Sequence, residues 1–86
     1  MDINQLILLV KNKIEKNIAV QDIAIKDKTY LHIKHKSHRH GKFHLELKVK
    51  SKELSNFSKI EGTKKIYKIL DEEMKKYIHS IQILIS

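Results

Sequence analysis

The hydrophobic positions change along the chain from helical spacing to strand-like alternation and back, which predicts the order helix, strand, strand, helix, strand. Asp2 can cap the first helix, and Gln5 lies three positions later, the spacing of a capping box. The apolar residues that follow recur every three or four positions and would face a core: Ile3, Leu6, Ile7, Val10 and Ile14. This helix is expected to end near Lys16 and Asn17.

Two strands are expected next, joined as a hairpin. Ile23 and Ile25 alternate with polar residues within positions 20–27, which favours a first strand. The second strand has the strictest alternation in the chain: Phe43, Leu45, Leu47 and Val49 against His44, Glu46, Lys48 and Lys50. On this pattern His44 lies on the solvent face and is a packing or hydrogen-bonding residue. Gly41 suits the turn before the second strand.

A second helix is predicted from Ser58 to about Tyr77, after an irregular connection or short helical turn. Ser58 and Glu61 have the spacing of a capping box, although Gly62 weakens the first turns and leaves a start near Thr63 open. One face of this helix is apolar through Ile66, Leu70, Met74 and Tyr77. Two acid–lysine pairs stand four apart on its outer face: Asp71 with Lys75, and Glu72 with Lys76.

The last strand is marked by the alternation of Ile81, Ile83 and Ile85, with His79 at its entrance. These elements predict one α+β domain over residues 1–86, an α-β-β-α-β sandwich with two helices on one face of a three-stranded mixed sheet. Because the hairpin fixes the first strand pair, the third strand is expected to return beside the first strand.

The size and composition of the chain narrow its class. Its 86 residues support a single modest core. The absence of cysteine excludes a disulfide scaffold and a thiolate zinc site, and it fits a reducing compartment. No apolar run is long enough to cross a bilayer, and the first residues lack the basic start of a secretory signal. We therefore expect a cytoplasmic protein without membrane contact, a monomer or weak homodimer when alone.

The net charge of +8, from 18 basic and 10 acidic residues, suggests a nucleic acid or another anionic partner. However, Arg39 is the sole arginine, and proteins that grip phosphate usually use the two-pronged guanidinium. The alternative is that the abundant lysine reflects compositional drift and keeps the protein soluble.

Histidine is the most informative residue type in the chain. Five of the six histidines lie within one stretch: His32, His35, His38, His40 and His44. The sixth, His79, stands near the C-terminus, where the structural alternative is a half-buried imidazole bonded to backbone. Without cysteine, imidazole is the strongest ligand this chain can offer a borderline metal. The stretch could instead be a solvated loop, or it could buffer zinc, nickel or copper by itself.

An enzyme is not expected from this sequence. There is no cysteine nucleophile and no glycine-rich phosphate loop. The spacing of the acids, serines and histidines favours neither a carboxylate pair nor a Ser-His-Asp arrangement. The function is therefore expected to be binding.

Five short motifs resemble, in order and spacing, those of the BolA-like family, over nearly the whole chain. The matching stretches are 27–32 (DKTYLH; family D-E-S-x-x-H), 44–45 (HL; H-F), 49–54 (VKSKEL; V-x-S-x-x-F), 66–70 (IYKIL; hydrophobic-Tyr-x-x-Leu) and 79–81 (HSI; H-A-L). The resemblance implies a fold similar to the type II KH fold.

The resemblance also implies a role in iron–sulfur cluster assembly or trafficking. BolA-like proteins pair with a monothiol glutaredoxin and share a [2Fe-2S] cluster with it, whereas the isolated protein holds none. The glutaredoxin cysteine and a glutathione thiolate would ligate one side, and histidines of this chain the other, as in a Rieske centre. By position the family's ligands correspond to His79 and His32, and the rivals of His32 are His35, His38 and His40.

Two departures from related proteins weaken the alternative, a DNA-binding transcriptional regulator. The chain has Gly62-Thr63-Lys64 where the family commonly has R-H-R, and it lacks the G-x-x-G loop with which KH domains hold nucleic acid backbone. If DNA were bound, the phosphate contacts would come from Lys59, Lys64, Lys65 and Lys68 on the second helix.

Overall fold

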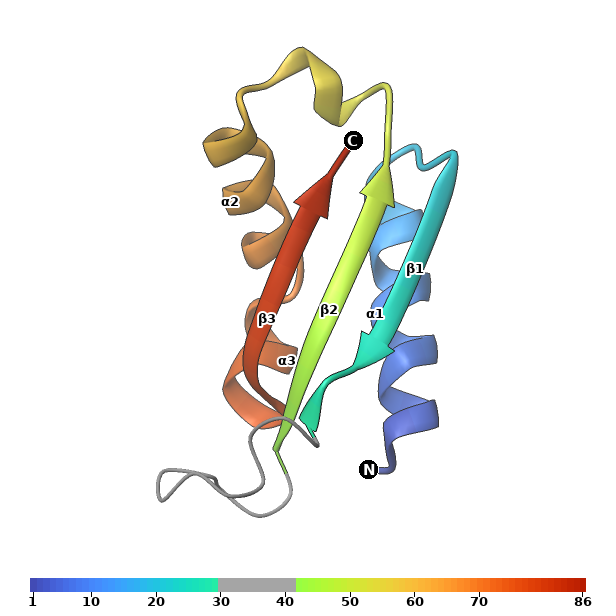
Figure 1. Cartoon of the computed structure of the whole chain (residues 1–86), viewed down its shortest axis with the longest axis vertical. Helices are drawn as coiled ribbons and strands as arrows, with labels where there is room; N and C mark the ends of the chain where they lie inside the picture. Colours follow the sequence, from blue (N-terminus) through green and yellow to red (C-terminus); the bar gives the residue numbers. More distant parts are fainter. Residues whose placement is uncertain (30–41) are drawn as a thin grey trace.

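A computed structural model describes residues 1–29 and 42–86, in which three helices lie on one side of a three-stranded sheet (Figure 1). In chain order the elements are α1 (Ile3–Asn17), β1 (Asp22–Asp27), β2 (Phe43–Lys50), a short 3-10 helix (Leu54–Asn56), α2 (Lys59–Ile69), α3 (Asp71–Lys76) and β3 (Ile78–Ile85). The predicted α+β architecture with a mixed sheet is confirmed.

The predicted start of α1 is confirmed in detail. The Asp2 carboxylate accepts a hydrogen bond from the Gln5 backbone N–H at 2.9 Å, and the Asp2 N–H donates to the Gln5 side chain at 3.1 Å. Both bonds satisfy backbone donors that a helix start leaves free. Of the five apolar residues predicted to face the core, Leu6, Val10 and Ile14 are buried, whereas Ile3 and Ile7 are half-buried.

The second predicted helix starts at its predicted cap but is interrupted. Ser58 Oγ accepts from the Glu61 N–H at 3.1 Å, so α2 begins at Lys59 and the later start near Thr63 is wrong. Leu70, with φ −96° and ψ 16°, separates α2 from α3, so the single helix expected to run to Tyr77 is two helices.

The acid–lysine pairs predicted on the second helix both form on α3. Lys75 Nζ lies 3.1 Å from the Asp71 carboxylate, and Lys76 Nζ lies 2.8 Å from that of Glu72. Both pairs are exposed, so they support the helix only weakly.

The order of strands in the sheet is β1-β2-β3, with β1 antiparallel and β3 parallel to β2. The hairpin is confirmed, but the expectation that β3 lies beside β1 was wrong. β2 is the most buried strand, since its Leu47 and Val49 are fully buried, whereas Ile23 and Ile25 of β1 are half-buried. It takes the central position, where both of its edges are paired with another strand. The segment through α2 and α3 thus serves as the crossover of a parallel β-α-β unit.

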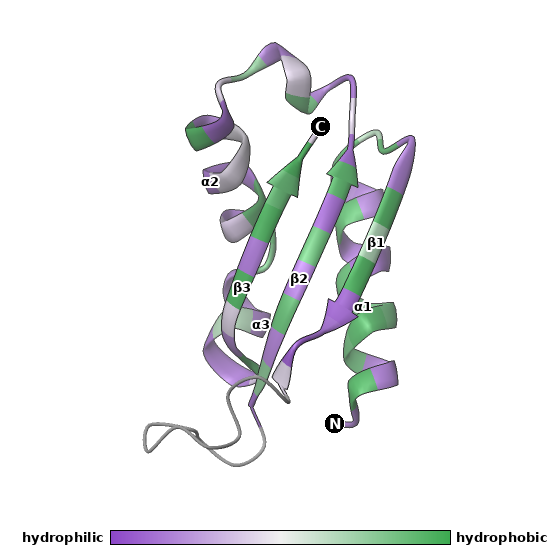
Figure 2. Cartoon of the chain, in the orientation of Figure 1, coloured by the Kyte–Doolittle hydropathy of each residue, from purple (hydrophilic) through white to green (hydrophobic). Residues whose placement is uncertain are grey.

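The core lies between the sheet and the helices, and apolar residues alternate with polar ones along the strands (Figure 2). Its buried members are Leu6, Val10, Ile14, Ile18, Leu45, Leu47, Val49, Leu54, Ile66, Leu70, Ile78 and Ile81. Gly62 is buried on α2, and a Cβ there would lie 3.0 Å from Ile85 Cδ1, so glycine permits the close packing of α2 on β3. Within the described ranges, no helix is long and apolar enough to span a membrane.

Candidate functional site

The ladder between β2 and β3 contains a register shift at His79. Phe43 is paired with Ile78, whereas His44 is paired with Ser80, so His79 is an extra residue in β3. β-bulges of this kind change the direction of a side chain and occur often beside active sites. Ile78 packs into the core while His79 is exposed. The shift therefore presents one imidazole to solvent at the N-terminal end of β3.

His44 lies beside this shift and is buried, with 5% of its surface exposed. Its Nδ1 lies 2.6 Å from Ser80 Oγ, and the two share a hydrogen bond. Its backbone N–H donates to Thr29 Oγ1 at 3.1 Å, and its carbonyl accepts from the Lys28 N–H at 2.7 Å. The predicted packing and hydrogen-bonding role of His44 is confirmed, but its predicted position on a solvent face was wrong, since the ring is covered.

The rings of His44 and His79 are in contact, with centroids 4.7 Å apart and planes tilted by 50°. Tilted packing of this kind is a favourable geometry for aromatic rings. His44 is buried and His79 is exposed, so the contact joins a covered ring to an accessible one. The half-buried, backbone-bonded position considered for His79 is therefore not the one it occupies.

The chain segments that enter and leave positions 30–41 are bonded to the same end of the sheet. The Thr29 N–H donates to Asp27 Oδ1 at 2.9 Å. On the other side, the Phe43 N–H donates to the Tyr77 carbonyl at 2.9 Å, and Lys42 Nζ lies 3.2 Å from the Lys75 carbonyl. The described ends of this segment thus lie near the strand ends that carry His44 and His79.

The remaining predicted ligands, His32, His35, His38 and His40, lie outside the described residues, as does the histidine stretch proposed to buffer metals. Among residues 1–29 and 42–86, no group of three or more His, Cys, Asp or Glu side chains could hold a metal ion. His79 can supply one accessible nitrogen, so any further ligands of a metal bound there must come from outside the described residues or from another molecule. Sequence reasoning missed the contact between His44 and His79, because it placed β3 beside β1 and not beside β2.

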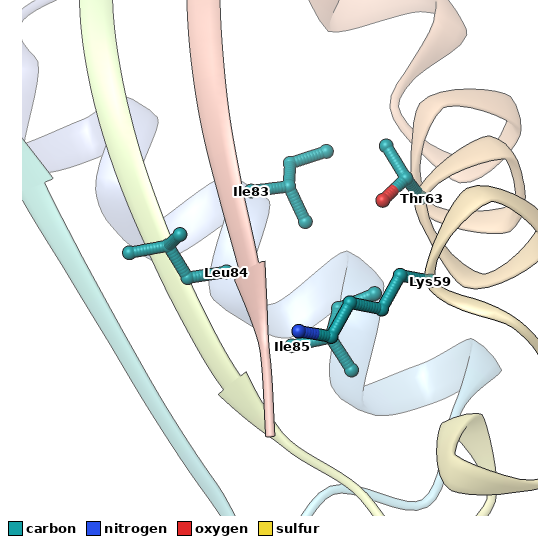
Figure 3. A pocket seen from close by; sticks show the side chains of 5 residues that line it. All are labelled: Lys59, Thr63, Ile83, Leu84 and Ile85. Atoms are coloured by element: carbon teal, nitrogen blue, oxygen red, sulfur yellow. The ribbon is translucent and has the colours of Figure 1, made fainter.

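The four lysines proposed for DNA contact lie on α2 but do not converge on one groove. Lys59 and Lys64 line a shallow apolar hollow with Ile60 and Tyr67. Lys59 also borders the hollow between α2 and β3, where Ile83 points toward Thr63 (Figure 3). The other two, Lys65 and Lys68, line a separate hollow with Lys13, Asn17 and Ile69.

Comparison with known proteins gives a consistent result. A family model described as "BolA-like protein" matches residues 14–86. A curated relative from Haemophilus influenzae, named "DNA-binding transcriptional regulator BolA", is 29% identical over 75 residues, which cover 87% of this chain and 70% of that protein.

Solved structures share the fold. The BolA domain of SufE1 from Arabidopsis thaliana superposes with a TM-score of 0.79 at 23% identity, covering 92% of this chain and 87% of that chain. BolA1 from the same plant gives 0.77 at 20% identity, with 91% and 86% covered. BolA1 from Mus musculus gives 0.71 at 16% identity, with 90% and 60% covered.

Proposed function

The chain belongs to the BolA-like family, and from this premise we propose that it is a non-enzymatic adaptor in iron–sulfur cluster assembly and trafficking. It pairs with a monothiol glutaredoxin, and the two proteins hold one [2Fe-2S] cluster between them as cargo. The observation that carries the proposal is the exposed imidazole of His79, which a register shift turns out of the sheet beside a second, buried imidazole.

The donors of this chain fit one side of such a cluster. The sequence has no cysteine, so imidazole nitrogen is the strongest ligand that it offers to iron, as on the histidine-bound iron of a Rieske centre. His79 is exposed, so a metal held by a partner can reach its ring without local unfolding. The second nitrogen is assigned to His32, with His35, His38 and His40 as its rivals. The glutaredoxin cysteine and a glutathione thiolate complete the ligand set.

This ligand set explains why a partner is required. Two imidazoles supply two of the four protein-side ligands that a [2Fe-2S] cluster takes, so the isolated chain does not complete the set and the two thiolates must come from outside it. We expect the proposed complex to form in the cytoplasm, where reduced glutathione is supplied. In that compartment the adaptor is a monomer or a weak homodimer until it meets the glutaredoxin.

The test is reconstitution of this protein with a monothiol glutaredoxin, glutathione, iron and sulfide. We expect the visible circular dichroism spectrum to differ from that of the glutaredoxin reconstituted alone, and His79→Ala to abolish the difference. Gln82→Ala is the matched control, because Gln82 is exposed on the same strand and offers no imidazole. If His79→Ala and the control behave alike, His79 is not a ligand.

DNA binding is the second candidate function, and the name of the Haemophilus relative favours it. Lys59, Lys64, Lys65 and Lys68 are all exposed on α2 and could contact phosphates. Their separation between two hollows predicts weak, unselective binding. A titration with duplex DNA tests this, since each phosphate contact removed by a Lys→Ala change should lower the salt slope by about 1. Absence of binding at low salt excludes this function.

A further inference from the structure

We propose that His44 is a positioning residue for His79, and that Ser80 fixes His44 in this role. The orientation of the His79 ring in the free protein is the direct consequence. The effect on cluster retention is a second consequence, and it rests on the proposed function. The evidence is the placement of these three side chains around one register shift.

The register shift creates a need for such a support. As the extra residue in β3, His79 has no register partner in β2. An exposed side chain at such a position can sample several rotamers, and a metal that binds it must stop that motion at a cost in conformational entropy. A ring already held in one orientation binds with less of this cost.

His44 is placed to supply that support. It is 5% exposed, and its backbone N–H and carbonyl form hydrogen bonds with Thr29 and Lys28. Its ring contacts the His79 ring, with 4.7 Å between the centroids. The hydrogen bond between Nδ1 and Ser80 Oγ, 2.6 Å long, restricts rotation of the ring about its Cβ–Cγ bond. Ser80 directly follows His79, so the same bond also ties down the backbone next to the shift.

The geometry argues against His44 as a ligand. Its Nδ1 is engaged with Ser80, and its Nε2 is buried. To reach an external metal, the ring would have to leave both the hydrogen bond and the space that it fills. His44 therefore acts through His79. This resembles the outer partners of metal-bound histidines, which orient a ligand without touching the metal.

Ser80→Ala is the sharpest test because it removes the hydrogen bond and leaves both imidazoles in place. The first readout is nuclear magnetic resonance of the free protein, which needs no cluster. We expect contacts between the His44 and His79 ring protons in the unaltered protein, and their loss with rotamer averaging at His79 in Ser80→Ala. Ser80→Thr keeps the hydroxyl and should restore the contacts, whereas Gln82→Ala should not affect them.

The second readout is the half-life of the cluster in the complex with glutaredoxin. We expect Ser80→Ala and His44→Ala to shorten it by about threefold to tenfold, in line with the entropy of one side chain, and Ser80→Thr to restore it. Unfolding midpoints are measured in parallel. If His44→Ala fails to fold, the comparison of Ser80→Ala with Ser80→Thr still decides the question.

Two results would overturn the proposal. One is an unchanged His79 ring in Ser80→Ala, and the other is a loss of ring order that Ser80→Thr does not restore. Failure of the proposed function looks different: His79→Ala would leave the spectrum of the complex unchanged, while the resonance measurement would still report whether His44 and Ser80 order His79.

Discussion

Nδ1 of His44 and Oγ of Ser80 lie 2.6 Å apart across the parallel ladder, one register position beyond the extra residue His79. A hydrogen bond thus joins two side chains that are 36 positions apart in sequence. The candidate site is formed by the pairing of β2 with β3, and His79 lies on its exposed side. Ligand binding and folding stability should consequently be separable at this residue.

His79→Ala should lower the stability of the free protein only slightly. The side chain is exposed and has no register partner in β2, so the change removes mainly the packing against the His44 ring, a contact worth about 0.5 to 1.5 kcal/mol. Urea unfolding followed by far-ultraviolet circular dichroism measures the change. Ile78→Ala, one position earlier in the core, should cost about 2 to 5 kcal/mol and serves as the positive control. A comparable loss in both variants would mean that His79 has a structural role.

The sequence specified the local elements better than their arrangement. The strict alternation over 43–50 gave β2, and the capping pair of Asp2 and Gln5 gave the start of α1, because both signals depend on neighbours in the chain. The place of β3 beside β2 depends on which strand becomes the central one, with neighbours on both edges. That choice depends on contacts between segments far apart in the sequence, which local patterns do not show.

The candidate site could be predicted only in part for the same reason. His79 was identified by resemblance to a family motif, and its exposure agrees with a ligand role. Alternation placed His44 on the face away from the core, but it could not show that the ring is covered and in contact with His79. Ile78 and Ile81 are both buried although they are three positions apart, whereas a regular strand buries every second residue. This spacing indicates the register shift, but only once the strand is known to begin at Ile78.

Gly62→Ala should be more favourable when Ile85 is shortened. A Cβ at position 62 would lie 3.0 Å from Ile85 Cδ1, the end of a half-buried side chain. Alanine gains about 1 kcal/mol of helix propensity, and in the natural background the contact offsets part of this gain. In the Ile85→Val background, which lacks Cδ1, Gly62→Ala should stabilise by about 0.5 to 1 kcal/mol. Equal effects of Gly62→Ala in both backgrounds would show that the contact is unimportant.

Removing the lysine of the ion pair between α1 and α3 should lower the stability of the protein more than removing the glutamate. Lys13 Nζ lies 2.8 Å from Glu73, whose side chain is 6% exposed, whereas that of Lys13 is 32% exposed. Lys13→Met leaves a buried carboxylate without its cation and should destabilise by about 1 to 3 kcal/mol. Glu73→Met leaves a lysine that can turn to water and should cost less. Urea unfolding of both variants decides the order, and a larger loss for Glu73→Met would contradict this account.

The pair of Glu72 and Lys76 should make a pH-dependent contribution to stability. The hydrogen bond from Lys76, followed by its charge, lowers the pKa of Glu72, and the same bond raises the pKa of Lys76. A lowered carboxyl pKa stabilises the folded state above the ordinary glutamate pKa, and this is lost as the pH falls through the folded value. A raised lysine pKa stabilises below the ordinary lysine pKa, and this is lost as the pH rises through the folded value. The contribution is therefore largest between the two.

Glu72→Gln should accordingly lower the urea midpoint slightly at neutral pH and have no effect once the pH is below the folded pKa of Glu72. The effect should be small, because both side chains are more than half exposed, and added salt should reduce it further. Gln82→Ala, which removes no charge, is the control at each pH. A difference between Glu72→Gln and the natural protein that persists unchanged in acid would have to come from helix propensity or packing, and would rule out the ion pair as its cause.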